Sequence, residues 1–200
     1  ALLAIVAGVV LGSIAALMRN KWPDRIIVFF VTLITSMPSF VIATLLLYFF
    51  CIKLGVVQAF NSESNMVLLP VISLSLSPMA YITRLTKTSM LDALGQDYIR
   101  TAKAKGVSQA KVIFVHGLRN ALIPVITYVG PMIGGILTGS MVIESIFNIG
   151  GLGSKFVSCI TNRDYTMIMA TTLFLAVIMV FANLITDIVY KLIDPRISLD

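Results

Sequence analysis

The sequence predicts an all-α, polytopic membrane protein. Hydrophobic residues make up 58% of its 200 residues and charged residues only 12%, whereas an average soluble domain is roughly a quarter charged. The charges are also clustered, so that residues 26–52 and 121–143 contain none. A helix needs roughly 20 apolar residues to cross a hydrocarbon core about 30 Å thick, and both segments are long enough. Lipid offers no partner for open strand edges, so we expect the spans to be helices.

Five apolar segments qualify as spans. They are residues 1–18, 26–52, 66–83, 121–143 and 166–193. We treat the whole chain, residues 1–200, as one transmembrane domain. The chain begins directly in an apolar stretch with Ala1, and no charged segment precedes it. This start is unlike a cleavable signal peptide, and we expect that an earlier helix is missing from the chain.

The basic residues predict the orientation of the spans. If successive connections alternate sides, 12 of the 15 lysines and arginines fall on one side and only Lys53, Lys155 and Arg163 on the other. Basic loops stay in the cytoplasm. The N-terminus is therefore expected outside and the C-terminus inside. Basic loops that meet anionic lipid headgroups account for most of the net charge of +6, and no nucleic-acid partner is implied.

Proline and serine interrupt three of the spans. Pro38 lies in the second span, Pro70 and Pro78 in the third, and Pro124 and Pro131 in the fourth. Proline removes a helical hydrogen bond and kinks the helix. Kinked helices that carry serine suit a wall around a polar path, but proline and glycine are also ordinary in membrane helices. Both interpretations remain open here.

Glycines spaced four apart in the first and fourth spans predict close helix packing. The pairs are Gly8 with Gly12, Gly130 with Gly134, and Gly135 with Gly139. This spacing lets two helix backbones approach each other. The contact could lie within the chain or against a second subunit.

The cytoplasmic segment 87–118 is amphipathic and should be structured. Ser89 followed by Asp92 is a helix-start pattern, and apolar residues then recur at helical spacing. Gly106 follows as a left-handed cap, and Ser108 can begin a second short helix. We expect a helix–glycine–helix element whose apolar face lies on the bilayer or docks into another protein.

The segment 144–165 is too short and too broken by glycine to span the membrane. Its apolar residues are interrupted by Gly150, Gly151 and Gly153. We expect it to form an extracytoplasmic loop that dips into the membrane surface or caps a cavity.

The run RTAKAKGVSQAKVIFVHGLRNALIPV, residues 100–125, resembles the EAA loop of bacterial ABC import permeases, whose pattern is E-A-A-x3-G-x9-I-x-L-P. Gly106 matches the glycine, Ala102 the second alanine and Leu118 the leucine. Arg-Thr replaces Glu-Ala before Ala102, and arginine rather than proline follows Leu118. These departures resemble the peptide-importer branch, and four further runs point the same way. They are DYIRTAKAKG (97–106), GSMVIESIFNIGGLG (139–153), NRDYT (162–166) and DPRI (194–197).

The chain is therefore identified as similar to the oligopeptide/dipeptide permease family, closest to its B-type subunit. Gly150 stands where that family is expected to have proline. The resemblance implies a type I ABC importer permease fold in the bacterial or archaeal cytoplasmic membrane, with a further first helix and an outer domain. Its implied partners are a second, non-identical permease, two ABC ATPases and an extracytoplasmic peptide-binding protein. Peptide is the implied substrate, and near relatives handle nickel or other small solutes.

In that family the EAA loop is a coupling helix that sits in a groove of the ATPase. The implied coupling residues are Arg100, Thr101, Ala102, Lys103, Gly106, Val107, Ser108, Val112 and Leu118. The resemblance also implies that ATP and Mg²⁺ lie on the ATPase subunits, so that this chain binds no cofactor and is not an enzyme.

The residues themselves also argue against catalysis by this chain. A phosphate loop needs G-x4-G-K-[ST], and the nearest string, Gly150 to Lys155, lacks a lysine directly after its glycine. His116 is the only histidine, and no metal-binding pattern is visible. Cys51 and Cys159 both fall on the predicted outer side, where a disulfide is possible, although two unpaired thiols fit the apolar surroundings of Cys51 better.

Two acids at the membrane edges are candidates for the path or a gate. Glu144 ends the fourth span on the outer side, where it either lines an outer gate or is simply solvated. Asp187 shares a face with Asn183 near the inner end of the fifth span, where buried charges are usually functional. Lys191 lies four residues further on, so a structural ion pair is the competing interpretation.

Two other classes of protein compete with the importer permease. A self-powered channel or carrier typically has charges inside its spans, whereas these spans are nearly free of charge. An intramembrane enzyme would show paired acids, a Ser–His pair or a metal site within its spans. Co-purification with an ATPase separates the permease from both.

Overall fold

The computed structural model describes residues 1–57 and 67–193, and all regular elements in these ranges are helices. In chain order they are α1 (Leu2–Leu17), α2 (Trp22–Ser36), α3 (Ser39–Leu46), the π-helical η1 (Leu47–Lys53), α4 (Leu68–Gly95), α5 (Asp97–Ala104), α6 (Gln109–Lys111), the π-helical η2 (Val112–Leu118), α7 (Arg119–Ala121), α8 (Ile123–Ile146), α9 (Leu152–Thr161) and α10 (Tyr165–Ile193). The predicted all-α class is confirmed.

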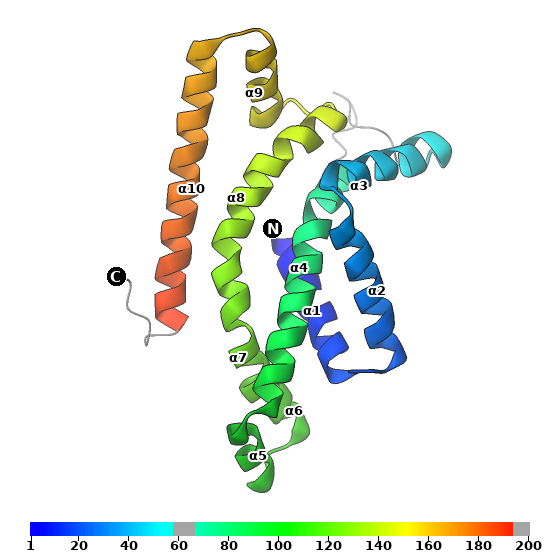
Figure 1. The fold of residues 1–200 in the computed structure, drawn as a ribbon, viewed down its shortest axis with the longest axis vertical. Coiled ribbons are helices and arrows are strands. Elements are labelled where there is room, and N and C mark those ends of the chain that lie inside the picture. Colours follow the sequence, from blue (N-terminus) through cyan, green and yellow to red (C-terminus); the bar gives the residue numbers. More distant parts are fainter. Residues whose placement is uncertain (58–66, 194–200) are drawn as a thin grey trace.

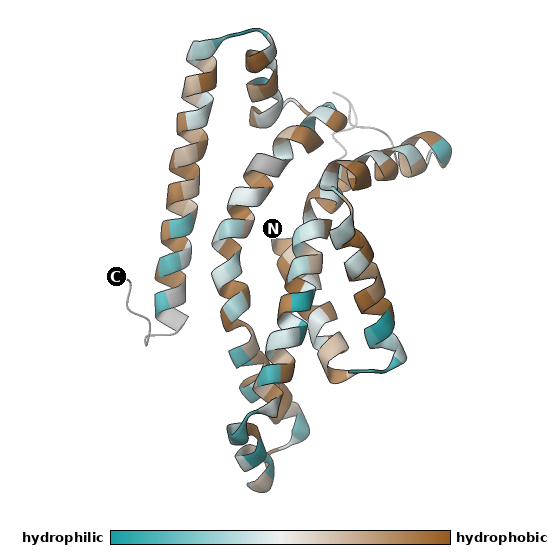
Figure 2. Cartoon of the chain, viewed as in Figure 1, coloured by the Kyte–Doolittle hydropathy of each residue, from teal (hydrophilic) through white to brown (hydrophobic). Residues whose placement is uncertain are grey.

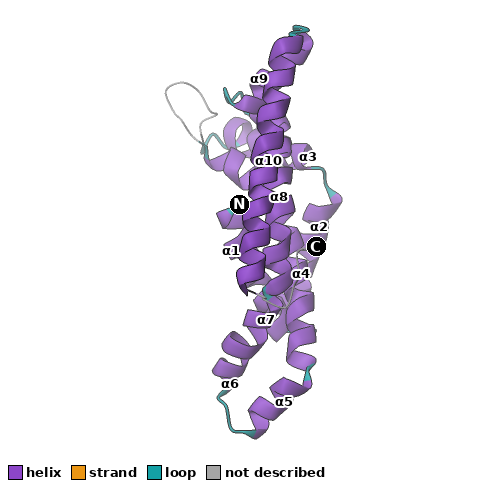
Figure 3. Ribbon diagram, turned by 90° about the vertical axis from the view of Figure 1, so that its left-hand side faces the viewer, coloured by secondary structure: helices purple, strands orange, loops and turns teal. Residues whose placement is uncertain are grey.

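The molecule is elongated, with α1, α2, α4, α8 and α10 running along its length (Figure 1). The turn between α5 and α6 lies at one extremity, and α9 lies near the other. The view from the side shows α5 and α6 projecting together beyond the long helices (Figure 3). The predicted coupling segment and the predicted outer loop therefore lie at opposite ends.

Each predicted span contains helix, but the spans differ in form. α4 and residues 165–189 of α10 are long and apolar enough to cross a membrane alone, and α1 is a shorter apolar helix of 16 residues. The segments 109–121 and 123–137 are together long and apolar enough for one span, and they meet at a bend of 42°. Hydrophobic residues line most of these long helices (Figure 2). The protein is a multi-span membrane protein.

The second predicted span, residues 26–52, is not one straight helix. α2 ends at Ser36, Met37 is extended, and α3 with η1 continues at 105° to α2. Pro38 explains the break, because its ring disfavours the helical conformation of the preceding residue and it has no N–H to donate. The predicted proline effect is confirmed here in a stronger form, since the chain turns through more than a right angle.

The third predicted span and the helix expected to start at Ser89 are one element. α4 continues without interruption from Leu68 to Gly95, with Pro78 inside it, so the expected helix start at Ser89 was wrong. Met90 is completely buried one residue later, and tertiary packing therefore favours a continuing helix over the local capping pattern. The true break comes at Gln96, which is extended and precedes α5. The predicted start at Met66 lies outside the described residues.

Close packing of α1 on α4 forms the main helix contact, and small residues allow it. A Cβ atom on Gly8 would lie 2.7 Å from Ile82 Cγ2, and one on Gly12 would lie 2.6 Å from the Thr83 carbonyl oxygen. Similarly, a Cβ on Gly130 would lie 3.1 Å from the Asn183 Oδ1 atom where α8 meets α10. The pairs Gly8 with Gly12 and Gly130 with Gly134 therefore pack against helices of the same chain. For these two pairs, the alternative of a contact within the chain holds.

Candidate functional site

The turn after α5 is a two-bond helix cap. Gly106 has a φ of +75°, its N–H donates to the Lys103 carbonyl at 3.0 Å, and the Val107 N–H donates to the Ala102 carbonyl at 3.1 Å. This pair of bonds is the Schellman arrangement, which requires a left-handed residue at the position of Gly106. The prediction that Gly106 is a left-handed cap is confirmed.

The second helix of the element begins where the sequence predicted. Ser108 is the N-cap residue of α6, and its carbonyl accepts the Val112 N–H at 3.0 Å, while its hydroxyl makes no capping bond. α6 does not end as a short separate helix. It continues through η2 and α7 towards α8, so that the turn at Gly106 is joined to a membrane span on each side.

The residues predicted to couple to an ATPase divide into an exposed group and an internal group. The exposed members are Arg100, Thr101, Lys103, Gly106 and Ser108, and the partly buried members are Ala102, Val107 and Leu118. Val112 is completely buried.

The expectation that Val112 and Leu118 belong to an exposed apolar face does not hold. Leu118 packs on a buried cluster that includes Met90 and Ala121, together with Leu91 and Leu94. These side chains hold together the ends of α1, α4 and α7 that lie nearest to the α5–α6 turn. They position the projecting turn and do not form its free surface.

The structure places a different apolar side chain on the surface of this element. Phe114 is 63% exposed and Val115 46% exposed, although both lie beside the buried Val112 in sequence. Sequence reasoning missed Phe114. Its neighbours Ile113 and Val115 are apolar as well, so the local pattern carries no signal that Phe114 is exposed.

A buried ion pair lies at the same end of the molecule and was not predicted. Asp24, in the first turn of α2, pairs with Lys87 of α4 and also accepts the Asn20 N–H at 2.9 Å. The Asp24 side chain is only 7% exposed and that of Lys87 23%. No local pattern could reveal this pair, because its members are 63 residues apart.

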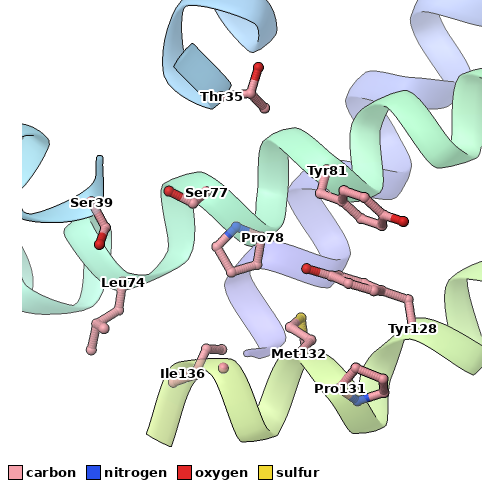
Figure 4. Close-up of a pocket in the computed structure, with 11 residues that line it drawn as sticks. Thr35, Ser39, Leu74, Ser77, Pro78, Tyr81, Tyr128, Pro131, Met132 and Ile136 are labelled. Atoms are coloured by element: carbon pink, nitrogen blue, oxygen red, sulfur yellow. The ribbon is translucent and has the colours of Figure 1, made fainter. Parts of the chain in front are cut away.

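A cavity of about 460 Å³ lies beside the proline bends and is lined mainly by α4 and α8. Thr35, Ser39 and Ser77 contribute hydroxyl groups, and Tyr81 of α4 lies against Tyr128 of α8 (Figure 4). The two rings have centroids 4.2 Å apart and planes tilted by 31°. The remaining lining residues are Leu74, Pro78, Pro131, Met132, Gly135 and Ile136. Among the residues that the structure describes, no charged side chain lines this cavity. The sequence indicated serine-bearing, kinked helices but did not indicate the tyrosine pair.

Glu144 is engaged in structure at the opposite end of the molecule. Its Oε2 atom accepts the Ser154 N–H at 3.0 Å, and a Cβ on Gly151 would lie 2.4 Å from that oxygen. The carboxylate therefore joins the end of α8 to the first turn of α9. Lys155 lies in the same turn of α9, which follows a helix rather than the strand that a phosphate loop requires.

Asn183 and Asp187 also lie away from the cavity. Asn183 is at the contact of α10 with α8, beside Gly130, and Asp187 is exposed. Asp187 and Lys191 are both described, and no ion pair joins them, so the interpretation as a structural ion pair does not hold. Exposed pairs at this spacing are worth only about 0.2–0.5 kcal/mol, which leaves both side chains free to be solvated.

Cys51 and Cys159 are free thiols.

Together, these features define a polytopic helical membrane protein with a structured helical turn projecting from one end and a hydroxyl-lined cavity between its spans. Residues 8–199 match the family described as binding-protein-dependent transport system inner membrane component. The chain belongs to this family.

Curated relatives carry names of the same kind. The chain is 49% identical over 199 residues to the dipeptide transport system permease protein DppB of Bacillus subtilis (strain 168) and 45% identical over 197 residues to the oligopeptide transport system permease protein OppB of Haemophilus influenzae. It is 40% identical over 195 residues to the glutathione transport system permease protein GsiC of Escherichia coli (strain K12). These matches cover 97–98% of this chain but only 64% of each relative.

Proposed function

We propose that this chain is the membrane-spanning permease part of an ATP-driven importer of peptides. Family membership and the names of the relatives support transport of peptides. In the proposed complex the chain forms half of the path and pairs with a second, similar permease. Two ATPase subunits hold ATP and Mg²⁺, an extracytoplasmic binding protein delivers the peptide, and this chain is not itself an enzyme. Its C-terminus and the α5–α6 turn face the cytoplasm.

The observation that carries the proposal is the geometry of the projecting turn. Two hydrogen bonds and a left-handed glycine fix it, buried Val112 and Ile99 anchor its two arms, and Phe114 remains exposed. A rigid turn joined to a span on each side is suited to pass a movement of an ATPase to the membrane helices. Within the described part of the chain, Arg100 makes one ion pair, with Asp97 at 3.5 Å on an open surface, so it stays available to a partner.

The proposal is tested by substitution of the turn glycine in the complete transporter. A Cβ on Gly106 would meet no atom within 4 Å, so any effect there arises from the backbone and not from crowding. Gly106→Val should distort the cap, because a β-branched residue strongly disfavours positive φ. Gly106→Asn should be tolerated, because asparagine adopts this conformation more readily. Gly95→Val is the matched control, since that site is equally open and has no positive φ.

We expect Gly106→Val to insert in the membrane but to lose peptide uptake and the stimulation of ATP hydrolysis by loaded binding protein. Ala102→Glu should weaken ATPase association, because burial of an unpaired charge is costly. The measurements are uptake in proteoliposomes and ATPase co-purification. If Gly106→Val and Ala102→Glu both bind the ATPases and transport peptide at the normal rate, the turn is not the coupling element.

A further inference from the structure

The hydroxyl-lined cavity continues towards the α5–α6 end. A second cavity of about 350 Å³ shares Thr35 and Tyr81 with the first and is otherwise lined by Arg84, Leu85 and Thr88. Ser77, Tyr81, Arg84 and Thr88 follow one another at intervals of four, three and four residues along α4. Residues with this spacing lie on one face of a helix. The two cavities are therefore neighbours along this face of α4, and Thr35 and Tyr81 line both; we call the two cavities together the groove.

The chemistry of the groove suits a peptide main chain. The Thr35 hydroxyl donates to carbonyls of its own helix at 3.0 Å, which leaves its oxygen lone pairs to accept an N–H. The hydroxyls of Ser39 and Ser77 have no hydrogen-bond partner in the described part of the chain, and a hydroxyl can donate as well as accept. A peptide bond offers one N–H and one carbonyl. The 460 Å³ cavity has, within the described ranges, no charged lining residue that would attract or repel a charged substrate side chain.

The tyrosine pair bridges the groove where its two parts meet. The close-up shows Tyr81 projecting from α4 over Tyr128 of α8, with the two hydroxyls at opposite ends of the stack (Figure 4). Neither hydroxyl has a hydrogen-bond partner among the described residues. The contact is a ring stack with centroids 4.2 Å apart and planes tilted by 31°. No hydrogen bond between described residues fixes the two rings together, and Tyr81 is 49% exposed.

We infer that Tyr81 and Tyr128 form the constriction of the path and that they recognise the peptide main chain rather than its side chains. The inference rests on the proposed function of the chain as a peptide permease. The rings part to admit an extended peptide, and their hydroxyls, with those of Thr35 and Ser77, exchange hydrogen bonds with successive peptide groups. Arg84, which makes no ion pair in the described residues, then meets the peptide on the cytoplasmic side.

The test uses the complete transporter, with its second permease, ATPases and binding protein, in proteoliposomes. Uptake is compared for a peptide and for the same peptide with N-methylated amides, which keeps the side chains and removes N–H donors. The variants are the double substitution Tyr81→Phe with Tyr128→Phe, which keeps both rings, and Tyr128→Ala, which removes one. The control is Tyr48→Ala, because Tyr48 has the same 49% exposure as Tyr81 but lies on η1, outside the groove. Since every variant uses the same binding protein, the selectivity of that protein cancels in the comparison.

In the wild type, the unmodified peptide should be imported faster than its methylated form. The double phenylalanine variant should lower this preference about three- to tenfold, as expected for lost hydrogen bonds, and Tyr48→Ala should leave it unchanged. Tyr128→Ala should also admit a bulkier branched peptide that the wild type excludes. In a background without Cys51 and Cys159, a cysteine at position 77 should react more slowly with a thiol reagent during turnover with peptide.

Two results separate the inference from the proposed function. If the wild type imports peptide but the tyrosine variants keep its preference, and position 77 reacts equally with and without peptide, the groove is not the path and the inference is wrong. If the wild-type complex assembles and imports no peptide, the proposed function itself is wrong. Should Tyr128→Ala fail to assemble, the double phenylalanine variant and the labelling at position 77 still decide the inference.

Discussion

Removal of Lys87 should destabilise the protein far more than removal of its partner Asp24. The two side chains pair between the first turn of α2 and the part of α4 nearer to the α5–α6 turn, but they are not equally buried. The Asp24 side chain is 7% exposed and the Lys87 side chain 23%. In Lys87→Met, Asp24 stays in the interior as a charge that keeps the Asn20 N–H as a hydrogen-bond donor and the field of Arg19 but loses its ion-pair partner. Loss of one member of a buried pair costs about 3–5 kcal/mol.

The opposite substitution leaves a residue that can reach water. In Asp24→Asn, the amide oxygen can still accept the Asn20 N–H, and the long aliphatic stem of Lys87 can carry its ammonium group to the surface. We expect a loss of about 1–3 kcal/mol, the usual cost of one disrupted buried hydrogen bond. The double substitution Asp24→Leu with Lys87→Met should recover much of the loss, because apolar replacement of a whole buried pair is often neutral.

The assay is the thermal unfolding midpoint of the detergent-solubilised transporter. The midpoint is read from the fraction of protein that remains monodisperse after heating to each temperature. The expected order is wild type and double variant highest, then Asp24→Asn, then Lys87→Met. Lys111→Met serves as a control, because Lys111 is exposed and makes no ion pair within the described residues. Equal losses for the two single variants would refute the argument from unequal burial, and additive losses in the double variant would refute the pairing itself.

Two further predictions concern packing and topology. Gly12→Val should reduce the yield of folded protein, because its Cβ would lie 2.6 Å from the Thr83 backbone oxygen of α4; normal yield and thermal stability would argue against this contact. Single cysteines at Gln109 and Asn162, in a background without native cysteine, should be labelled by an impermeant thiol reagent in intact cells only at position 162, and the reverse pattern would invert the proposed orientation.

Local features of the fold were predictable from the sequence, and contacts between distant segments were not. Gly106 was found because a left-handed cap depends on a few adjacent residues, and the break at Pro38 because proline acts on its immediate neighbour. The expected helix start at Ser89 failed because burial of Met90 outweighs a local capping pattern. The pairing of Asp24 with Lys87 and the stacking of Tyr81 on Tyr128 depend on how α4 meets α2 and α8, and no periodicity along the chain encodes that meeting.

The same reasoning explains why α4 can connect the two candidate sites. The helix carries Tyr81 at the groove and ends at Gly95, directly before the projecting turn. The intervening 14 residues span about 21 Å at 1.5 Å per residue, and a continuous helix transmits displacement over that distance. Pro78 has no N–H for the Leu74 carbonyl, so the helix bends most easily between Leu74 and Pro78, on the N-terminal side of Tyr81. A pull on the turn would therefore move Tyr81 with the part of α4 that follows Pro78, while the part before Pro78 stays in place. Under the proposed coupling role, movement at the ATPase thus acts first on the stacked tyrosines.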